Sequence, residues 1–159
     1  MEELADLLNG ENQLVEALPK MVEASQSLTL KFVLRAHLEV AIGHAERLQD
    51  IISNIGQVSQ RLKNKTMKGL IEESEEVINH TVKCQDRDST IINVVKLVEC
   101  YEIVVYQTAC EHAADLGHTR IVELLNRTLK EEREMSLHLN ELALGMDNAR
   151  DINAQGHRQ

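Results

Sequence analysis

Residues that end or bend helices are scarce in this chain, whose 159 residues include one proline and seven glycines. Because helices usually stop near such residues, the elements between them must be long. Apolar residues recur with a period of about 3.6 in five segments, at about residues 2–24, 30–54, 69–79, 90–116 and 120–144. We therefore predict an all-α protein.

The connections between these segments predict how they are arranged. Tight turns join the first two helices and the last two, so each pair must run antiparallel. Roughly 35 residues, including the short middle helix, separate the two pairs. Such a crossover is typical of the ferritin-like antiparallel four-helix bundle, which is our predicted fold, and an irregular five-helix bundle is the alternative. We assign residues 1–145 to the bundle and residues 146–159 to a flexible C-terminal tail, because the apolar period is lost there.

Composition and charge argue against several classes of partner. The formal net charge of -9 would repel a nucleic-acid backbone, and aromatic residues, at 2% of the chain, offer little for base stacking. No apolar run approaches the ~20 residues that span a bilayer. The three cysteines are an odd number, and the first residues, MEELADLL, do not read as a signal sequence. We therefore predict a cytoplasmic protein that binds neither nucleic acid nor membrane.

Titratable side chains interrupt the apolar stripe of every long helix. At 100° per residue they fall near the centre of the stripe, where the helix should face the core. An ionised group is costly to bury alone, so these positions are the candidate functional residues. They are Glu11 in the first helix, His37 and His44 in the second, Glu99 and Glu102 in the fourth, and Glu132 in the fifth.

The heights of these residues in the bundle also agree. Glu11 lies sixteen residues before Ser27 in the first turn, and His44 lies seventeen residues after it. Glu102 and Glu132 are each fifteen residues from Gly117 in the last turn. Residues at equal distances from the turn of an antiparallel hairpin face each other, so Glu11 should meet His44 and Glu102 should meet Glu132.

Two explanations can account for several carboxylates in one layer of a core. A pair of divalent cations would relieve their desolvation and repulsion, and carboxylate with imidazole ligands suits iron, manganese or zinc. Alternatively, protons and Arg47, which falls on the inner side of the second helix, could neutralise Glu11 or Glu102. Tyr106, one turn from Glu102, is either a neighbour of the site or ordinary core filling.

Several segments resemble motifs of a known family. They are residues 10–14 (GENQL) with 17–21 (ALPKM), 37–39 (HLE) with 46–48 (ERL), 67–73 (MKGLIEE), 99–103 (ECYEI) and 129–132 (LKEE). In this order, over about residues 4–144, they are similar to the YciE/YciF family of bacterial ferritin-like stress proteins. The resemblance implies a role in stress responses without an assigned reaction. It also implies a cluster like a dinuclear metal site, with Glu11, His37, Glu99, Glu102 and Glu132 at the matching positions.

The chain departs from the family pattern at three positions. It has Val40 where the family usually has Glu, Cys100 where His is common, and Ser136 where Asp is common. We expect Cys100 to be buried and inert. Either His44 replaces a lost ligand, or the site has decayed and persists as a packing scaffold.

Two functional hypotheses follow. In the first, the protein is a ferritin-like bacterial stress-response protein whose two divalent metal ions, iron before manganese or zinc, handle iron or reduced oxygen species. In the second, the protein is a non-enzymatic helical module that has lost the metal site. It would act by homodimerisation or by binding an unidentified stress-related protein. Apolar residues lie on more than one face of the fourth helix, such as Ile103, Val104 and Val105, so either the crossover helix or a second copy of the chain should bury them. Neither hypothesis assigns a catalytic residue.

Overall fold

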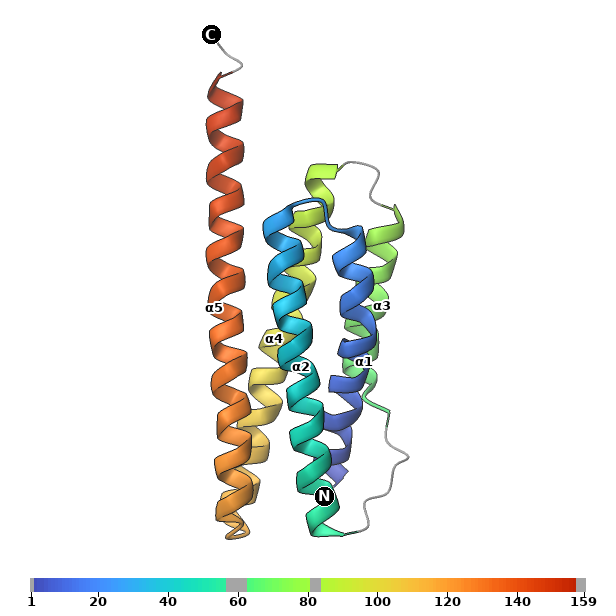
Figure 1. Ribbon diagram of the computed structural model, residues 1–159, viewed down its shortest axis with the longest axis vertical. Helices are drawn as coiled ribbons and strands as arrows, with labels where there is room; N and C mark the ends of the chain where they lie inside the picture. Colours follow the sequence, from blue (N-terminus) through green and yellow to red (C-terminus); the bar gives the residue numbers. More distant parts are fainter. Residues whose placement is uncertain (1, 57–62, 81–83, 157–159) are drawn as a thin grey trace.

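The computed structural model describes residues 2–56, 63–80 and 84–156, and these residues form five helices and no strand. The helices are α1 (Glu2–Ala24), α2 (Leu28–Ile55), α3 (Lys65–His80), α4 (Cys84–Asp115) and α5 (Thr119–Gly156). Figure 1 shows α1 with α2 as one antiparallel hairpin and α4 with α5 as another, while α3 packs against α1 and α4. The predicted all-α antiparallel bundle, with a short helix in the long crossover, is confirmed.

The predicted first and last residues of α1 and α2 are close to the observed ones, but the predicted starts of α3 and α4 are wrong. α3 begins at Lys65, four residues earlier than predicted. Asn64 precedes it and caps its first turn, because Asn64 Oδ1 accepts a hydrogen bond from the Met67 N–H at 2.8 Å. α4 begins at Cys84, six residues earlier than predicted. The polar residues 84–89 include no glycine or proline, so nothing in them prevents a helix.

The last helix is also longer than predicted. α5 continues to Gly156 instead of ending near Leu144, and Figure 1 shows it projecting beyond the other helices. A single glycine inside a helix costs only about 1 kcal/mol, so Gly145 alone does not end α5. The predicted tail, residues 146–159, therefore begins as helix, and its last three residues lie outside those that the structure describes. Its flexibility remains a prediction.

A buried carboxyl group joins the two hairpins at the α1–α2 turn. Asp88, near the start of α4, accepts hydrogen bonds from the backbone N–H groups of Gln26 and Ser27, each at 2.8 Å. The Ser27 hydroxyl in turn caps α2 by accepting from the Leu30 N–H at 3.3 Å. At the opposite end, Gly117 adopts a φ of 73° in the α4–α5 turn, a conformation that glycine accepts without strain. These contacts set the heights of the helices relative to one another.

The apolar core is divided into two clusters. The first core cluster lies toward the α1–α2 turn and includes Leu14, Leu18, Leu34, Val95, Met135 and Leu139. The second core cluster lies toward the α4–α5 turn and includes Leu7, Leu48, Tyr106, Leu125 and Leu129. On α1, Glu11 falls between Leu7 and Leu14, and on α5, Glu132 falls between Leu129 and Met135. The inward titratable residues therefore form a layer between the two apolar clusters.

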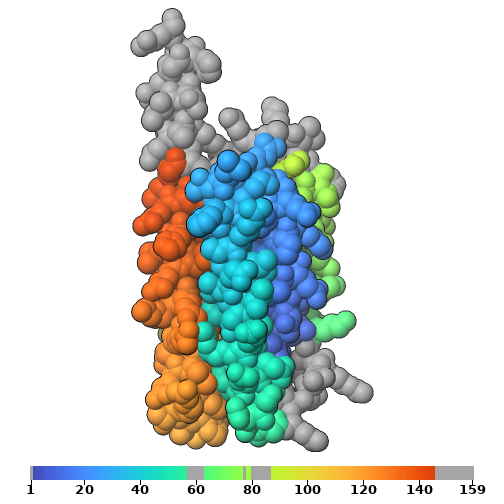
Figure 2. All heavy atoms as spheres, viewed as in Figure 1, coloured from blue at the N-terminus to red at the C-terminus, as the bar shows by residue number. Residues whose placement is uncertain are grey.

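None of the helices formed by the described residues has the length and apolarity that a bilayer-spanning segment requires. In Figure 2, the side chains of α2 lie against those of α1 and α5 along one face of the bundle. The layer of titratable residues is covered, since each of them is at most 2% exposed.

Candidate metal centre

The residues predicted to face the core come together in the middle of the bundle. All of them are buried, and they belong to α1, α2, α4 and α5. The predicted contact between Glu11 and His44 is confirmed, with 3.4 Å between Glu11 Oε1 and His44 Nδ1. Glu102 and Glu132 also meet as predicted, within one group of buried side chains. The buried residues are Glu11, His37, His44, Glu99, Glu102 and Glu132.

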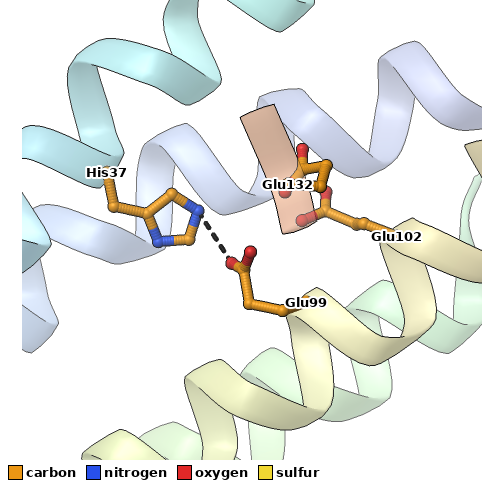
Figure 3. Close-up of side chains that lie close together, drawn as sticks. All are labelled: His37, Glu99, Glu102 and Glu132. Carbon is orange, nitrogen blue, oxygen red and sulfur yellow. Dashed lines mark ion pairs between the residues drawn. The ribbon is translucent and has the colours of Figure 1, made fainter. Parts of the chain in front are cut away.

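One group consists of His37, Glu99, Glu102 and Glu132. Each offers a ligand atom, and these atoms lie within 4.8 Å of one another. Figure 3 shows the four side chains pointing toward a common space from α2, α4 and α5. The dashed line in Figure 3 marks the ion pair between His37 Nε2 and Glu99 Oε1, which lie 3.0 Å apart. This is the spacing expected of ligands around a single cation.

A second group lies beside the first and consists of Glu11, His44 and Glu132. His44 Nδ1 is 2.7 Å from Glu132 Oε1. Glu132 thus belongs to both groups, and a carboxylate with two oxygens can bind one cation with each of them. The arrangement suits two neighbouring cations, one with four protein ligands and the other with three.

Burial changes the acidity of the four carboxyl groups. Desolvation is the main cause that raises the pKa of Glu99 to about 8, and it raises the pKa of Glu102 well above its usual range. Desolvation also raises the pKa values of Glu11 and Glu132, although the nearby His44 opposes this effect. Without a cation, Glu99 therefore keeps its proton at neutral pH, and burial favours the protonated form of Glu102 as well.

The two histidines differ in charge. Desolvation lowers the pKa of His37, so its contact with the protonated Glu99 joins two neutral groups. Desolvation would also lower the pKa of His44, but Glu11 and Glu132 outweigh it and raise this pKa to about 10. In the metal-free protein His44 is therefore a cation that offsets the charge of Glu11 and Glu132. A metal ion that binds Nδ1 must displace its proton.

Many polar atoms of the cluster lack a hydrogen bond. Among the described residues, no hydrogen bond satisfies either oxygen of Glu99 and Glu132, one oxygen of Glu11 and of Glu102, or Nδ1 of His37 and His44. Some of these atoms lie only in the ion-pair contacts given above. Buried polar atoms are nearly always hydrogen-bonded. A single layer with this many unsatisfied polar atoms therefore requires an explanation. Divalent cations would bind the lone pairs of these atoms. Carboxylate oxygens with imidazole nitrogens are a donor set that suits iron, manganese or zinc, so the residues present fit such ions.

Tyr106 lies at the edge of the cluster, on the side of the second core cluster. Its hydroxyl donates a hydrogen bond of 2.5 Å to Glu11 Oε1, and the side chain is fully buried. Desolvation and the charge of Glu11 raise the pKa of Tyr106 well above its usual range, so the phenol stays protonated. Tyr106 therefore both fills the core and fixes the orientation of Glu11.

Arg47 is not paired with Glu11 or Glu102, although the second of the two explanations allowed such a pair. Arg47 Nη1 instead pairs with Glu131 Oε2 at 3.0 Å and donates to the Thr128 hydroxyl. Glu131 is a residue that sequence reasoning missed, because it lies at the side of the inner stripe of α5. The signal for it is its position directly before Glu132, in the segment that carries the family resemblance.

The three departures from the family pattern lie outside both groups of ligands. Val40 and Ser136 are only partly buried, and Cys100 is exposed, so its predicted burial is wrong. Cys100 occupies the outer face of α4, since the next residue but one, Glu102, faces the core. The candidate ligands that the structure brings together do not depend on these positions.

Comparisons with known proteins agree with this fold. Residues 1–150 match a family described as a domain of unknown function, DUF892. The chain is 36% identical to the protein YciF of Escherichia coli (strain K12) over 151 residues, which cover 94% of this chain and 91% of that protein.

Two solved structures are also similar. The crystal structure of the E. coli stress protein YciF has a TM-score of 0.87 and 36% identity, covering 92% of this chain and 93% of that one. YcfI, described as a putative structural protein from Rhodopseudomonas palustris, has a TM-score of 0.83 and 33% identity. That similarity covers 87% of this chain and 88% of that one. The similarity to both structures therefore extends over nearly the whole bundle.

Proposed function

The chain belongs to the DUF892 family, and on that premise we propose that it is a ferritin-like bacterial stress-response protein with a dinuclear metal site in its core. One observation carries the proposal: two groups of buried ligands share Glu132. His37, Glu99 and Glu102 would hold one ion, and Glu11 and His44 would hold the other. Iron is the first choice, with manganese or zinc as alternatives. When bound, iron would supply redox chemistry toward dioxygen or peroxide.

The residues around the site would control its surroundings. The two core clusters exclude water from both ends of the charged layer. Tyr106 holds Glu11 through its hydroxyl, so this carboxylate is oriented before an ion arrives. We propose that this dry, oriented site handles iron or reduced oxygen species during stress, and we assign no catalytic residue.

Metal loading tests the proposal directly. Purified protein is incubated anaerobically with Fe(II), loosely bound metal is removed, and the metal content is measured. We expect close to two ions per chain, and a large loss in Glu102→Ala. The matched control is Glu111→Ala, which removes an exposed carboxylate from the same helix and should bind metal like the wild type. Wild-type protein that retains no metal would refute the dinuclear site.

The alternative, a helical module that acts through homodimerisation, has its own supporting observation. Leu97 and Val104 on α4 and Leu137 on α5 are 50%, 63% and 63% exposed. Leu97 and Leu137 are each twenty residues from Gly117, so they lie at the same height on the α4–α5 hairpin. We propose that these residues contact a second copy of the chain, whether or not the core of the bundle holds metal.

The molar mass in solution tests the dimer. Light scattering coupled to size-exclusion chromatography should give twice the chain mass of 18.0 kDa for the wild type. Val104→Glu should give a monomer, whereas Glu111→Ala should leave the mass unchanged. A monomeric wild type at all concentrations would refute the dimer and leave the metal proposal untouched.

We also propose that the protein works in the cytoplasm. Cys100 is exposed and free, and an exposed thiol persists in a reducing compartment. Thiol labelling of protein in intact cells, with fractionation, should find Cys100 reduced and in the cytoplasmic fraction. Recovery from an oxidising compartment would contradict the assignment.

A further inference from the structure

Glu131 contacts the nitrogen of His44 that faces away from the cluster. Glu131 Oε2 is 3.0 Å from His44 Nε2, whereas His44 Nδ1 is 2.7 Å from Glu132 Oε1. The imidazole therefore spans the space between a partly exposed carboxylate and the buried ligands. The exposed fractions of the side chains, 28% for Glu131 and 1% for His44, place this contact at the boundary of the core.

Two arginines fix the carboxylate of Glu131 in this position. Arg47, on α2, donates from Nη1 to Glu131 Oε2 at 3.0 Å, and it also donates to the Thr128 hydroxyl. Arg127, one turn earlier on α5, donates from Nε to Glu131 Oε1 at 3.1 Å. Both oxygens of Glu131 are therefore engaged. A carboxylate held by two guanidinium groups is ionised and can only accept a hydrogen bond from His44.

This contact selects one tautomer of the imidazole. Because Glu131 accepts at Nε2, the Nε2 atom must carry a proton, and neutral His44 then has its lone pair on Nδ1. That lone pair points to Glu11 and Glu132. We infer that Glu131 is a positioning residue that orients His44 for metal binding through Nδ1. The inference rests on the proposed function and adds a residue that touches no metal.

The same reasoning predicts that the two halves of the site differ. His37 has no equivalent of Glu131, since its Nδ1 has no hydrogen-bond partner among the described residues. Loss of Glu131 should therefore weaken the ion held by Glu11 and His44, and should spare the ion held by His37, Glu99 and Glu102. A structural role for Glu131 would instead weaken both ions together.

Stepwise Zn(II) binding tests the inference, using the full chain and a competing chelator. In Glu131→Gln the amide can offer either an oxygen or an NH₂ group to His44, so the tautomer is no longer enforced. Removing such a partner of a histidine ligand typically lowers metal affinity about 10- to 100-fold, and we expect this loss for one of the two ions. Glu134→Gln is the matched control, because it removes an exposed carboxylate of α5 that pairs with Lys130.

A second measurement separates positioning from folding. In the Zn(II)-loaded wild type, ¹⁵N NMR of labelled histidine should show His44 bound through Nδ1 and protonated at Nε2. In Glu131→Gln this Nε2 proton should exchange faster with solvent, while the melting temperature of the metal-free protein changes little. A wild type that binds no Zn(II) overturns the proposed function and this inference with it. Two ions bound with unchanged affinities in Glu131→Gln, or with equal losses, overturn the inference alone.

Discussion

We expect Glu99→Gln to gain stability relative to the wild type as the pH rises from 5 to 8, when both proteins are free of metal. Glu99 is fully buried, and desolvation raises its pKa from 4.5 to about 8. A carboxyl group whose pKa is higher in the folded state stabilises the fold fully below the unfolded pKa. That contribution is lost as the pH rises through the folded pKa. Glutamine does not titrate, so the variant escapes the loss.

The size of the effect follows from the shift. One pKa unit corresponds to about 1.4 kcal/mol, and the interval from pH 5 to 8 covers most of the difference between the unfolded and folded pKa values of Glu99. The wild type should therefore lose about 3 kcal/mol of unfolding free energy relative to Glu99→Gln over this interval. A difference between two pH values cancels any constant cost of burying the new amide. The expected loss of unfolding free energy is a large fraction of the ~5–15 kcal/mol that stabilises a typical domain.

Urea unfolding in the presence of a chelator, followed by circular dichroism at pH 5, 6, 7 and 8, measures the difference. Equal m-values are required before midpoints are converted into free energies. The matched control is Glu111→Gln, in which the exposed carboxyl group of α4 is neutralised, and its curve should parallel the wild type. Parallel curves for Glu99→Gln and the wild type would refute the claim that Glu99 is desolvated and protonated at neutral pH.

Three further predictions concern the same layer and its supports. Divalent metal should raise the melting temperature more at pH 8 than at pH 5, because protons compete with the metal for carboxyl groups whose pKa values are raised. Equal increases at the two pH values in calorimetry would contradict this. Asp88→Ala should cost about 1–3 kcal/mol in urea unfolding, because the N–H groups of Gln26 and Ser27 lose their acceptor. Tyr106→Phe should destabilise the metal-free protein by about 1 kcal/mol, because Glu11 loses a donor. An unchanged urea midpoint in either variant would show that its contact contributes nothing.

Much of this site could be predicted from the sequence because the tight turns fix the register of each hairpin. Counting residues from Ser27 and Gly117 is enough to place Glu11 beside His44 and Glu102 beside Glu132. Counting within a hairpin says nothing about contacts between hairpins. The contact of His44 with Glu132 therefore appears only in the folded structure, where Asp88 helps to set the heights of the two hairpins.

The errors have a common physical origin. A helical stripe identifies the centre of a buried face well, but residues at its sides can turn toward either neighbour or toward solvent. Arg47 lies at such a side position and pairs with Glu131 instead of Glu11. Glu131 lies at a side position of α5, so nothing in the periodicity of that helix distinguishes it from a solvated residue. Helix ends were misplaced for a related reason, since polar residues without glycine or proline permit a helix without requiring one.

The charged layer itself bears on the choice between a metal site and a packing scaffold. Replacing buried charged groups by apolar residues of similar volume often leaves stability unchanged or raises it by 1–4 kcal/mol. Here four carboxyl groups occupy one layer between two apolar clusters, and many of their oxygens have no hydrogen bond among the described residues. Leucine at these positions would join the two clusters into a continuous core. A scaffold alone gives no reason to keep these carboxyl groups, whereas a pair of cations would use them as ligands.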